Sequence, residues 1–251
     1  MPVVLTDCSK ILRRSLAQGL LLAAALQPAW ATDFSVSPIL VSLKPGAMSE
    51  TITVANHAKE RLRVNIKLMA WTQDADGKDV YAESSDLVYF PRQLDIDPES
   101  KKIVRLGLKS PAGASERAYR LFVEEVPDVG GTTARAAVNF NFRFGVPVFV
   151  PPVAAGNGCE VGEPRLEKGK VSIPVRNDGN EHVRLLPLKV SDGADTVQAI
   201  TAWYSLPGTA RTYTADIPAE ACRKAKVLNV TAEGEGLSVQ RQLNVDPANC
   251  A

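Results

Sequence analysis

The stretch from Val138 to Val150, VNFNFRFGVPVFV, decides the fold class of this chain. Every second residue from the first onward is apolar, and the residues between are mostly polar or small until Phe149. This alternation is typical of a β-strand with one buried face. That face carries three of the seven phenylalanines of the chain, so it needs a large apolar partner. The partner is either the core of the same domain or another protein that receives the strand, and the pattern alone leaves both possibilities open.

The N-terminus has the features of a secretory signal peptide. Arg13 and Arg14 precede an apolar run, and Ala29-Trp30-Ala31 provides a cleavage site of the small-x-small type. The run is too short to span a bilayer, and no later segment approaches the length required. We therefore expect residues 1–31 to be removed, and the mature chain to be secreted without stable insertion in the membrane.

The composition excludes some partners and favours a β-rich fold. Lys and Arg number 29 against 28 Asp and Glu, so the net charge of +1 provides no field that would attract nucleic acid. The 17 prolines and 17 glycines are spread along the chain, as expected for many short strands joined by turns.

Alternating segments separated by turn residues predict two sets of strands, before and after a small-residue linker at 153–158. The first set is expected at 34–43, 50–54, 62–71, 87–90, 94–96, 102–108, 119–126 and 138–150. The second is expected at 170–176, 182–188, 198–204, 212–217, 226–231 and 237–245. We therefore predict an all-β chain with two β-sandwich domains, at residues 32–152 and 153–251.

Three cysteines remain after the signal peptide, and an oxidising compartment favours one disulfide among them. Folding the expected hairpin at its Gly234-Glu235-Gly236 turn brings Cys222 close to Cys250, which favours that pair. A bridge between Cys159 and Cys222 is the alternative. A metal site is not expected, because no CxxC or nearby His accompanies these residues.

The ordered motifs of the mature chain resemble the PapD-like family, the periplasmic chaperones of the chaperone–usher pathway that assembles pili. The resemblance is densest before Pro152 and rests on a set of short motifs rather than on any single one. These are Ser37-Pro38, Val54-Ala55-Asn56, Ala70-Trp71, Pro91-Arg92-Gln93-Leu94, Ile103-Val104-Arg105-Leu106, Tyr119-Arg120-Leu121, Glu125-Val126-Pro127 and Val146-Pro147-Val148-Phe149.

The resemblance implies two immunoglobulin-like β-sandwich domains in a boomerang arrangement, with the last strand of the first domain lent to a pilus subunit. A subunit of this pathway is an incomplete sandwich, and the lent strand covers the groove that it would otherwise expose. The implied donor residues are Val138, Phe140, Phe142, Phe144 and Val146. The implied partners are pilus or fimbrial subunits and an outer-membrane usher.

The family usually anchors the C-terminal carboxylate of the subunit with an Arg in the first strand and a Lys in the donor strand. In an ungapped alignment these positions fall at Val41 and near Val146 or Pro147, and none of these residues is basic. Folding the last hairpin of the first domain about Gly130-Gly131 suggests instead that Arg120 and Arg143 are neighbours and bind the carboxylate together. The alternative is that each pairs with a local acid, such as Glu116 or Glu124, or is simply solvated.

The residues do not favour an enzyme, and no catalytic residue, metal or cofactor is expected. His57 and His182 follow turn sequences and are expected to be exposed, and neither a G-x-S-x-G motif nor a phosphate-binding loop is present. The alternative function is a secreted structural or adhesive β-sandwich protein, such as a pilus subunit. A subunit should be one incomplete domain, whereas this chain has two expected domains and its lendable strand lies in the middle.

Overall fold

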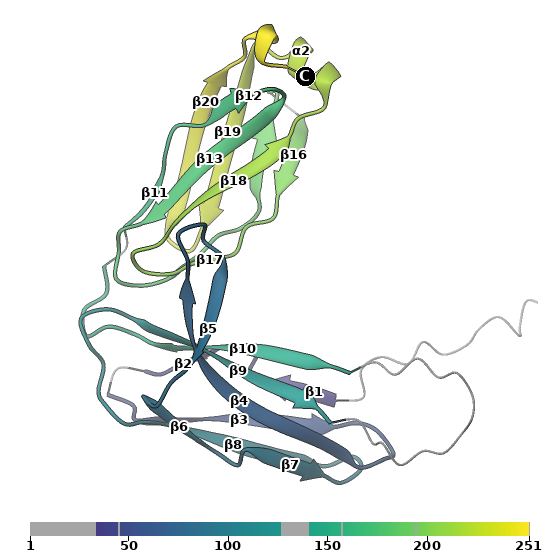
Figure 1. Cartoon of the computed structure of the whole chain (residues 1–251), viewed down its shortest axis with the longest axis vertical. Coiled ribbons are helices and arrows are strands. Elements are labelled where there is room, and N and C mark those ends of the chain that lie inside the picture. The colour runs from purple at the N-terminus through teal and green to yellow at the C-terminus, as the bar shows by residue number, and fades with distance from the viewer. Residues whose placement is uncertain (1–33, 45, 127–140, 157, 194, 251) are drawn as a thin grey trace, which may run out of the picture. The chain divides into compact units, whose positions relative to one another are not determined.

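The computed structural model describes residues 34–44, 46–126, 141–156, 158–193 and 195–250, and these are almost entirely β-strands (Figure 1). Alternation of buried and exposed side chains explains why the strands form. Along β4 (Leu62–Gln73), for example, Leu62, Val64, Ile66 and Leu68 are buried, and the residues between them are not. A strand with this pattern buries one face against a second sheet.

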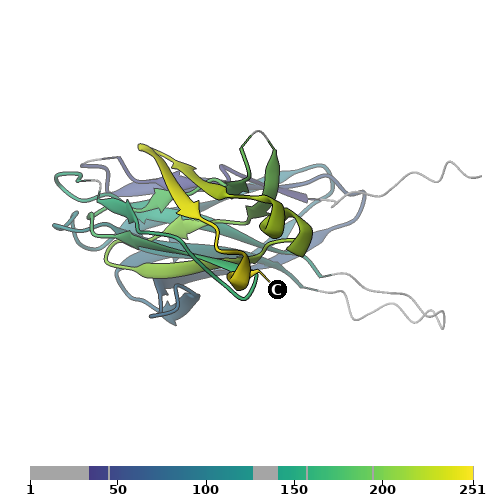
Figure 2. The ribbon, with the colours of Figure 1, turned by 90° about the horizontal axis from the view of Figure 1, so that it is seen from above.

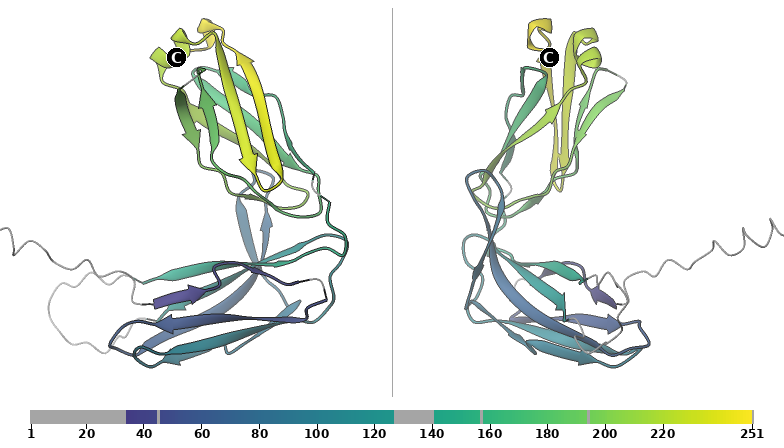
Figure 3. Two further views of the ribbon diagram at one scale, coloured as in Figure 1. Left: turned by 180° about the vertical axis from the view of Figure 1, so that it is seen from behind. Right: turned by 45° about the vertical axis from the view of Figure 1, so that its right-hand side comes forward.

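Two sheets formed before residue 151 pack on each other. The first has the order β1 (Phe34–Ser37), β3 (Ser49–Asn56), β8 (Lys101–Leu108), β6 (Leu87–Phe90). The second has the order β2 (Val41–Ser42), β10 (Arg143–Val150), β9 (Arg117–Glu125), β4, β5 (Asp79–Glu83), with β7 (Gln93–Ile96) also paired to β4. Their facing side chains form one core, which includes Ile52, Val54, Val64, Val104, Leu121 and Val148. Both views of Figure 3 show these strands.

A second core lies in the residues that follow. One sheet has the order β11 (Cys159–Val161), β13 (Lys170–Asn177), β12 (Arg165–Glu167), with β18 (Ala210–Asp216) also on β13. Another has the order β16 (Thr196–Ile200), β15 (Leu188–Ser191), β19 (Val227–Gly234), β20 (Leu237–Asn244), and β14 (Val183–Arg184) pairs with β17 (Tyr204–Ser205). The core includes Val171, Ile173, Leu188, Val190, Leu228 and Val230. The all-β class with two sandwich cores is therefore confirmed.

The second sandwich is closed by the disulfide that the sequence favours. The strands β19 and β20 form the expected hairpin, and Gly236 adopts a positive φ at its turn. Cys222, on the short helix α2 (Ala219–Lys224), is bonded to Cys250, just after the 3₁₀ turn η1 (Pro247–Asn249). Figures 1 and 2 show the chain end beside α2. The half-buried Cys159 forms no disulfide with any described residue, and burial raises the pKa of its thiol.

Candidate functional site

The strand β10 has one fully paired edge and one edge that is mostly open. It pairs with β9 along its whole length, from Arg143 opposite Glu124 to Val150 opposite Arg117. On its other side β2 pairs only with Val148 and Phe149. Among the described residues no strand covers residues 143–147 on that side. Along this half, the backbone groups that do not pair with β9 are therefore available to an added strand, except that Pro147 has no N–H and the Gly145 carbonyl oxygen accepts from Arg120.

The apolar face of β10 changes its environment along the strand. Val146 is 3% exposed and lies in the core of the first sandwich, so its side chain is not available to a partner, contrary to its place in the expected donor set. Phe144 is partly buried and packs edge-on against Phe34, with 5.0 Å between the ring centroids. Phe142, just before the strand, is 38% exposed. Val138 and Phe140 lie outside the described residues.

The expectation that Arg120 and Arg143 are neighbours is wrong. The β9–β10 ladder sets Arg120 opposite Pro147 and Arg143 opposite Glu124, with Phe122 and Gly145 forming the pair between them. Folding about Gly130-Gly131 would set Arg120 opposite residue 141, whereas the observed register sets it opposite Pro147. The Gly-Gly pair is therefore not the point about which the two strands pair, and a Gly-Gly signal alone does not fix the register.

Arg143 follows the alternative considered above and pairs with a local acid. Its Nε lies 2.9 Å from Oε1 of Glu124, and the other carboxylate oxygen of Glu124, Oε2, lies 3.3 Å from Nζ of Lys67. The guanidinium of Arg143 sits 3.7 Å above the centroid of the Phe122 ring. Because the Arg143 side chain is 56% exposed, this ion pair contributes little to stability.

Arg120 is in a different environment, because it is 5% exposed. Its guanidinium lies 4.0 Å above the ring of Trp71 and 5.9 Å from that of Trp203. One N–H group donates to the carbonyl oxygen of Gly145, at 3.3 Å, and Nη2 lies 4.0 Å from Oδ2 of Asp79. The Nε atom is buried and has no hydrogen-bond partner in the described part of the chain. The guanidinium also interacts with the Tyr81 hydroxyl, but its Nε remains without a partner among the described residues, and a buried guanidinium with an unused donor can accept an anionic ligand.

Gly145 makes room for this arrangement. A Cβ at this position would lie 3.2 Å from Cε1 of Phe122 and 3.3 Å from Cδ of Arg120. Both distances are tighter than ordinary van der Waals contact, so a larger residue would require the two side chains to shift by a few tenths of an ångström. The sequence shows this glycine only as an interruption between apolar positions.

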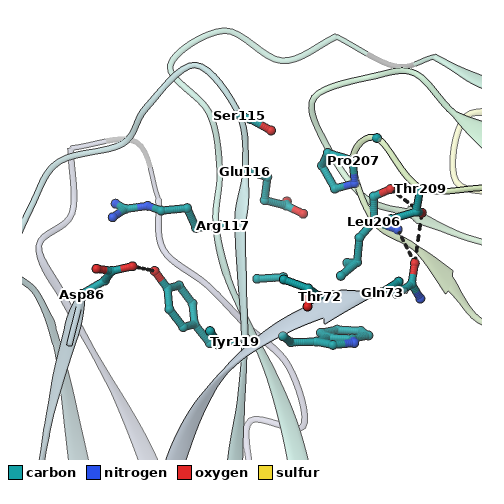
Figure 4. A pocket seen from close by; sticks show the side chains of 14 residues that line it. Thr72, Gln73, Asp86, Ser115, Glu116, Arg117, Tyr119, Leu206, Pro207 and Thr209 are labelled. Carbon is teal, nitrogen blue, oxygen red and sulfur yellow. Dashed lines mark hydrogen bonds between the residues drawn. The ribbon is translucent and has the colours of Figure 1, made fainter. Parts of the chain in front are cut away.

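A pocket of about 440 Å³ lies beside the aromatic cluster of Trp71, Phe149 and Tyr204 (Figure 4). The hydroxyl of Tyr119 in its lining donates to Asp86, at 3.0 Å. Burial, with a smaller contribution from that hydrogen bond, raises the pKa of Tyr119 to about 12. These contacts stabilise the site and suggest no catalytic group.

The expectation that His182 is an exposed turn residue is wrong. Its Nδ1 lies 2.8 and 2.9 Å from the two carboxylate oxygens of Glu116, and its ring stacks on Phe149 with 3.7 Å between centroids. The turn sequence that precedes His182 does not by itself make this residue exposed. A residue next to a turn is covered when another segment packs over it. His57, by contrast, contacts Ser35 at an exposed site.

Sequence reasoning missed Gln73 and Asp79, which lie beside Arg120. The amide nitrogen of Gln73 donates to Oδ1 of Asp79, at 3.1 Å, and to the carbonyl oxygen of Tyr204, at 2.8 Å. Its amide oxygen accepts hydrogen bonds from the backbone of Leu206 and the hydroxyl of Thr209 (Figure 4). Gln73 ends β4 and Asp79 begins β5, so the two residues flank the turn of this hairpin. Only the turn signal between them is visible in the sequence.

Comparisons with known proteins agree with this architecture. The CsuC chaperone, in its complex with the CsuE tip adhesion subunit from archaic Csu pili of Acinetobacter baumannii, is 21% identical, with a TM-score of 0.62, over 84% of this chain and 98% of that one. The SafB chaperone complex with the SafA pilin from Salmonella enterica gives 14% identity and a TM-score of 0.55, over 86% of this chain and 98% of the matched one. The Pseudomonas aeruginosa CupB2 chaperone is 15% identical with a TM-score of 0.53, and the match covers 84% of this chain and 100% of the CupB2 chain.

At these identities the structural comparisons establish the fold, and no protein of curated function is significantly similar to the chain. Residues 33–155 match the family described as pili and flagellar-assembly chaperone, PapD N-terminal domain. Within the described residues, no helix has the length and apolar character needed to cross a bilayer. The first sandwich therefore belongs to the PapD N-terminal domain family of pili and flagellar-assembly chaperones.

Proposed function

We propose that this protein binds pilus or fimbrial subunits in the periplasm by donor-strand complementation and delivers them to an outer-membrane usher. Residues 1–31 direct secretion and are removed, residues 32–152 form the domain that carries the donor strand, and residues 153–251 form the second domain. The observation that carries the proposal is the open edge of β10 over residues 143–147, next to the exposed ring of Phe142.

An open strand edge and an apolar face together suit an incomplete β-sandwich as the partner. The edge supplies main-chain hydrogen bonds, and alternate side chains fill the groove where the subunit lacks a strand. The donor side chains are Val138, Phe140 and Phe142, with Phe144 at the boundary, because Val146 already serves the core of this chain. Two of the similar structures are, by their descriptions, complexes of a chaperone with a subunit or pilin.

Arg120 is the residue best suited to hold the terminal carboxylate of the subunit. It lies opposite Pro147, two pairs along the ladder from Gly145, whose carbonyl oxygen it contacts, and its guanidinium is incompletely hydrogen-bonded. A carboxylate bound there would fix the register of the added strand, and a slip of one residue would turn every apolar side chain to the wrong face. Arg143 plays a secondary part, because Glu124 already pairs with it.

The test is co-purification from periplasm of cells that express the subunit of the same assembly system. The Phe140→Asp/Phe142→Asp variant should fold but lose the subunit, because an unpaired charge in the groove is costly. Phe90→Asp is the matched control, since Phe90 is 76% exposed on β6 in the other sheet. Normal capture by the donor-strand variant, or its failure to fold, would contradict the proposal.

Delivery to the usher is tested separately. The chaperone–subunit complex should accumulate in the periplasm of cells without the usher, and it should bind to usher-containing membranes, whereas the free chaperone should bind them weakly. Equal retention of the complex by membranes with and without the usher would contradict delivery.

A further inference from the structure

One carboxylate lies within ion-pair distance of the Arg120 guanidinium among the described residues, and it belongs to Asp79. Asp79 begins β5, a strand at the edge of its sheet that pairs only with β4. Its Oδ2 lies 4.0 Å from Nη2 of Arg120, which is too long for a hydrogen bond. The pair is therefore held by charge attraction and not by the bidentate geometry that makes Arg–carboxylate pairs strong.

Asp79 has two other partners, Gln73 and Tyr81, of which Tyr81 also interacts with Arg120. The Gln73 amide nitrogen donates to Oδ1, at 3.1 Å, and the Tyr81 hydroxyl donates to Oδ2, at 3.2 Å. Burial raises the pKa of Tyr81, so this hydroxyl remains a donor at neutral pH. The Asp79 carboxylate, which is 26% exposed, would thus keep hydrogen bonds and water if Arg120 turned to another anion.

The two partners of this ion pair are unequally satisfied. Asp79 accepts two hydrogen bonds, whereas Arg120 has a long bond to the Gly145 carbonyl oxygen and an unpartnered Nε. A carboxylate that reached Arg120 in bidentate geometry would therefore improve the hydrogen bonding of the arginine at little cost to the aspartate.

We propose that Asp79 is a built-in competitor for the carboxylate site: it neutralises Arg120 in the empty chaperone and is displaced by the C-terminal carboxylate of a subunit. This inference rests on the proposed function, in which Arg120 anchors that carboxylate. Asp79 then acts as a specificity residue. A peptide carbonyl or an amide carries no charge with which to displace it, so the site selects true chain ends over internal segments.

The test uses sodium acetate as the probe and follows the Nε–H NMR signal of Arg120 at constant ionic strength. Asp79→Asn keeps the size of the side chain and a carbonyl oxygen for Gln73 but removes the competing charge. Acetate should bind this variant about 10-fold more tightly than wild type, a coupling of the size typical between linked sites. Acetamide should have no effect on either protein.

Two controls make the result specific. Asp95→Asn removes an equal charge from an exposed pair with Arg63 and should leave acetate binding unchanged. In Asp79→Asn/Arg120→Gln the gain should vanish, as judged by acetate-dependent tryptophan fluorescence from Trp71 and Trp203, while thermal denaturation confirms that each variant is folded. Equal acetate affinity of wild type and Asp79→Asn would overturn the inference, as would a gain that persists in the double variant.

This experiment is separable from the test of the anchor itself. Wild-type chaperone should prefer a peptide of the last subunit strand with a free carboxylate over the same peptide amidated, and Arg120→Gln should abolish the preference. If that preference is absent, the anchor fails. If the preference is present and Asp79→Asn does not change acetate affinity, the anchor stands and only the competitor role of Asp79 is wrong.

Discussion

The two halves of β10 have the same alternation but different surroundings. From Val146 to Val150 all five residues are buried, and β2 covers the far edge at Val148 and Phe149. From Arg143 to Gly145 the side chains are exposed or partly buried, and that edge is open among the described residues. A single apolar pattern thus serves two purposes, with one half completing the core of the chain and the other half left for a partner.

The largest effect is expected in the buried half. Val148→Asp places an unpaired charge at a fully buried core position, which should destabilise the protein by about 4 kcal/mol or more and unfold the first sandwich. Urea denaturation followed by circular dichroism measures this loss. A stable, soluble Val148→Asp variant would show that the two halves of the strand do not differ as described.

Removal of the disulfide tests whether the stability of the protein can fall while its capture of subunits is kept. Cys222→Ala/Cys250→Ala opens a loop with a sequence separation of 28 residues and should lower stability by about 3 kcal/mol through loop entropy. Because the bridge lies in the second sandwich, the folded variant should still capture subunits at low temperature. Cys159 should react with alkylating reagents in the wild type, after unfolding if not before. Loss of capture by the folded variant would link the second sandwich to β10.

The decrease in the free energy of unfolding at alkaline pH should depend on the ionisation of Tyr119, which lies opposite Val148 in the β9–β10 ladder. Its pKa is raised from 10 to about 12, so between these values the unfolded chain ionises while the folded chain does not. This stability is present below pH 10 and is lost as the pH rises toward 12, at about 1.4 kcal/mol per pH unit. Tyr119→Phe should have a shallower decline over this range, and an identical slope would contradict the assignment.

In the open half, Phe142→Asp should leave the unfolding midpoint nearly unchanged and weaken subunit capture by about 10- to 100-fold, the range typical of an interface anchor. Isothermal titration with the purified subunit or its groove-forming fragment measures the change. A matched drop in thermal stability would show instead that Phe142 serves the core of this chain.

The smallest effect is expected at Arg143. Arg143→Gln breaks an exposed pair with Glu124 and should change stability by less than about 1 kcal/mol. Capture should weaken by less than in Arg120→Gln, because Arg120 is buried and incompletely hydrogen-bonded. The opposite order of the two variants in the same binding assay would move the anchor to Arg143.

The alternation of apolar residues and the turn signals were enough to predict most of the strands and the hairpin of β19 and β20, but they missed β5, β11 and β12. They also favoured the Cys222–Cys250 pair, because a hairpin of known turn fixes which residues lie at its open end. The same reasoning failed between β9 and β10, because the two strands do not pair about Gly130-Gly131. A shift of the pairing point by a few residues changes the register, so Arg120 and Arg143 lie at separate sites.

Local sequence therefore determined the all-β class, the order of the strands and the apolar face of residues 138–150, since these depend on periodicity within a few residues. Tertiary structure decided where that face stops being core and where Arg120 meets Trp71 and Asp79. It also placed His182, partly buried, against Glu116. Such contacts join segments far apart in the chain, and their geometry depends on register and packing, which alternation of residue types does not encode.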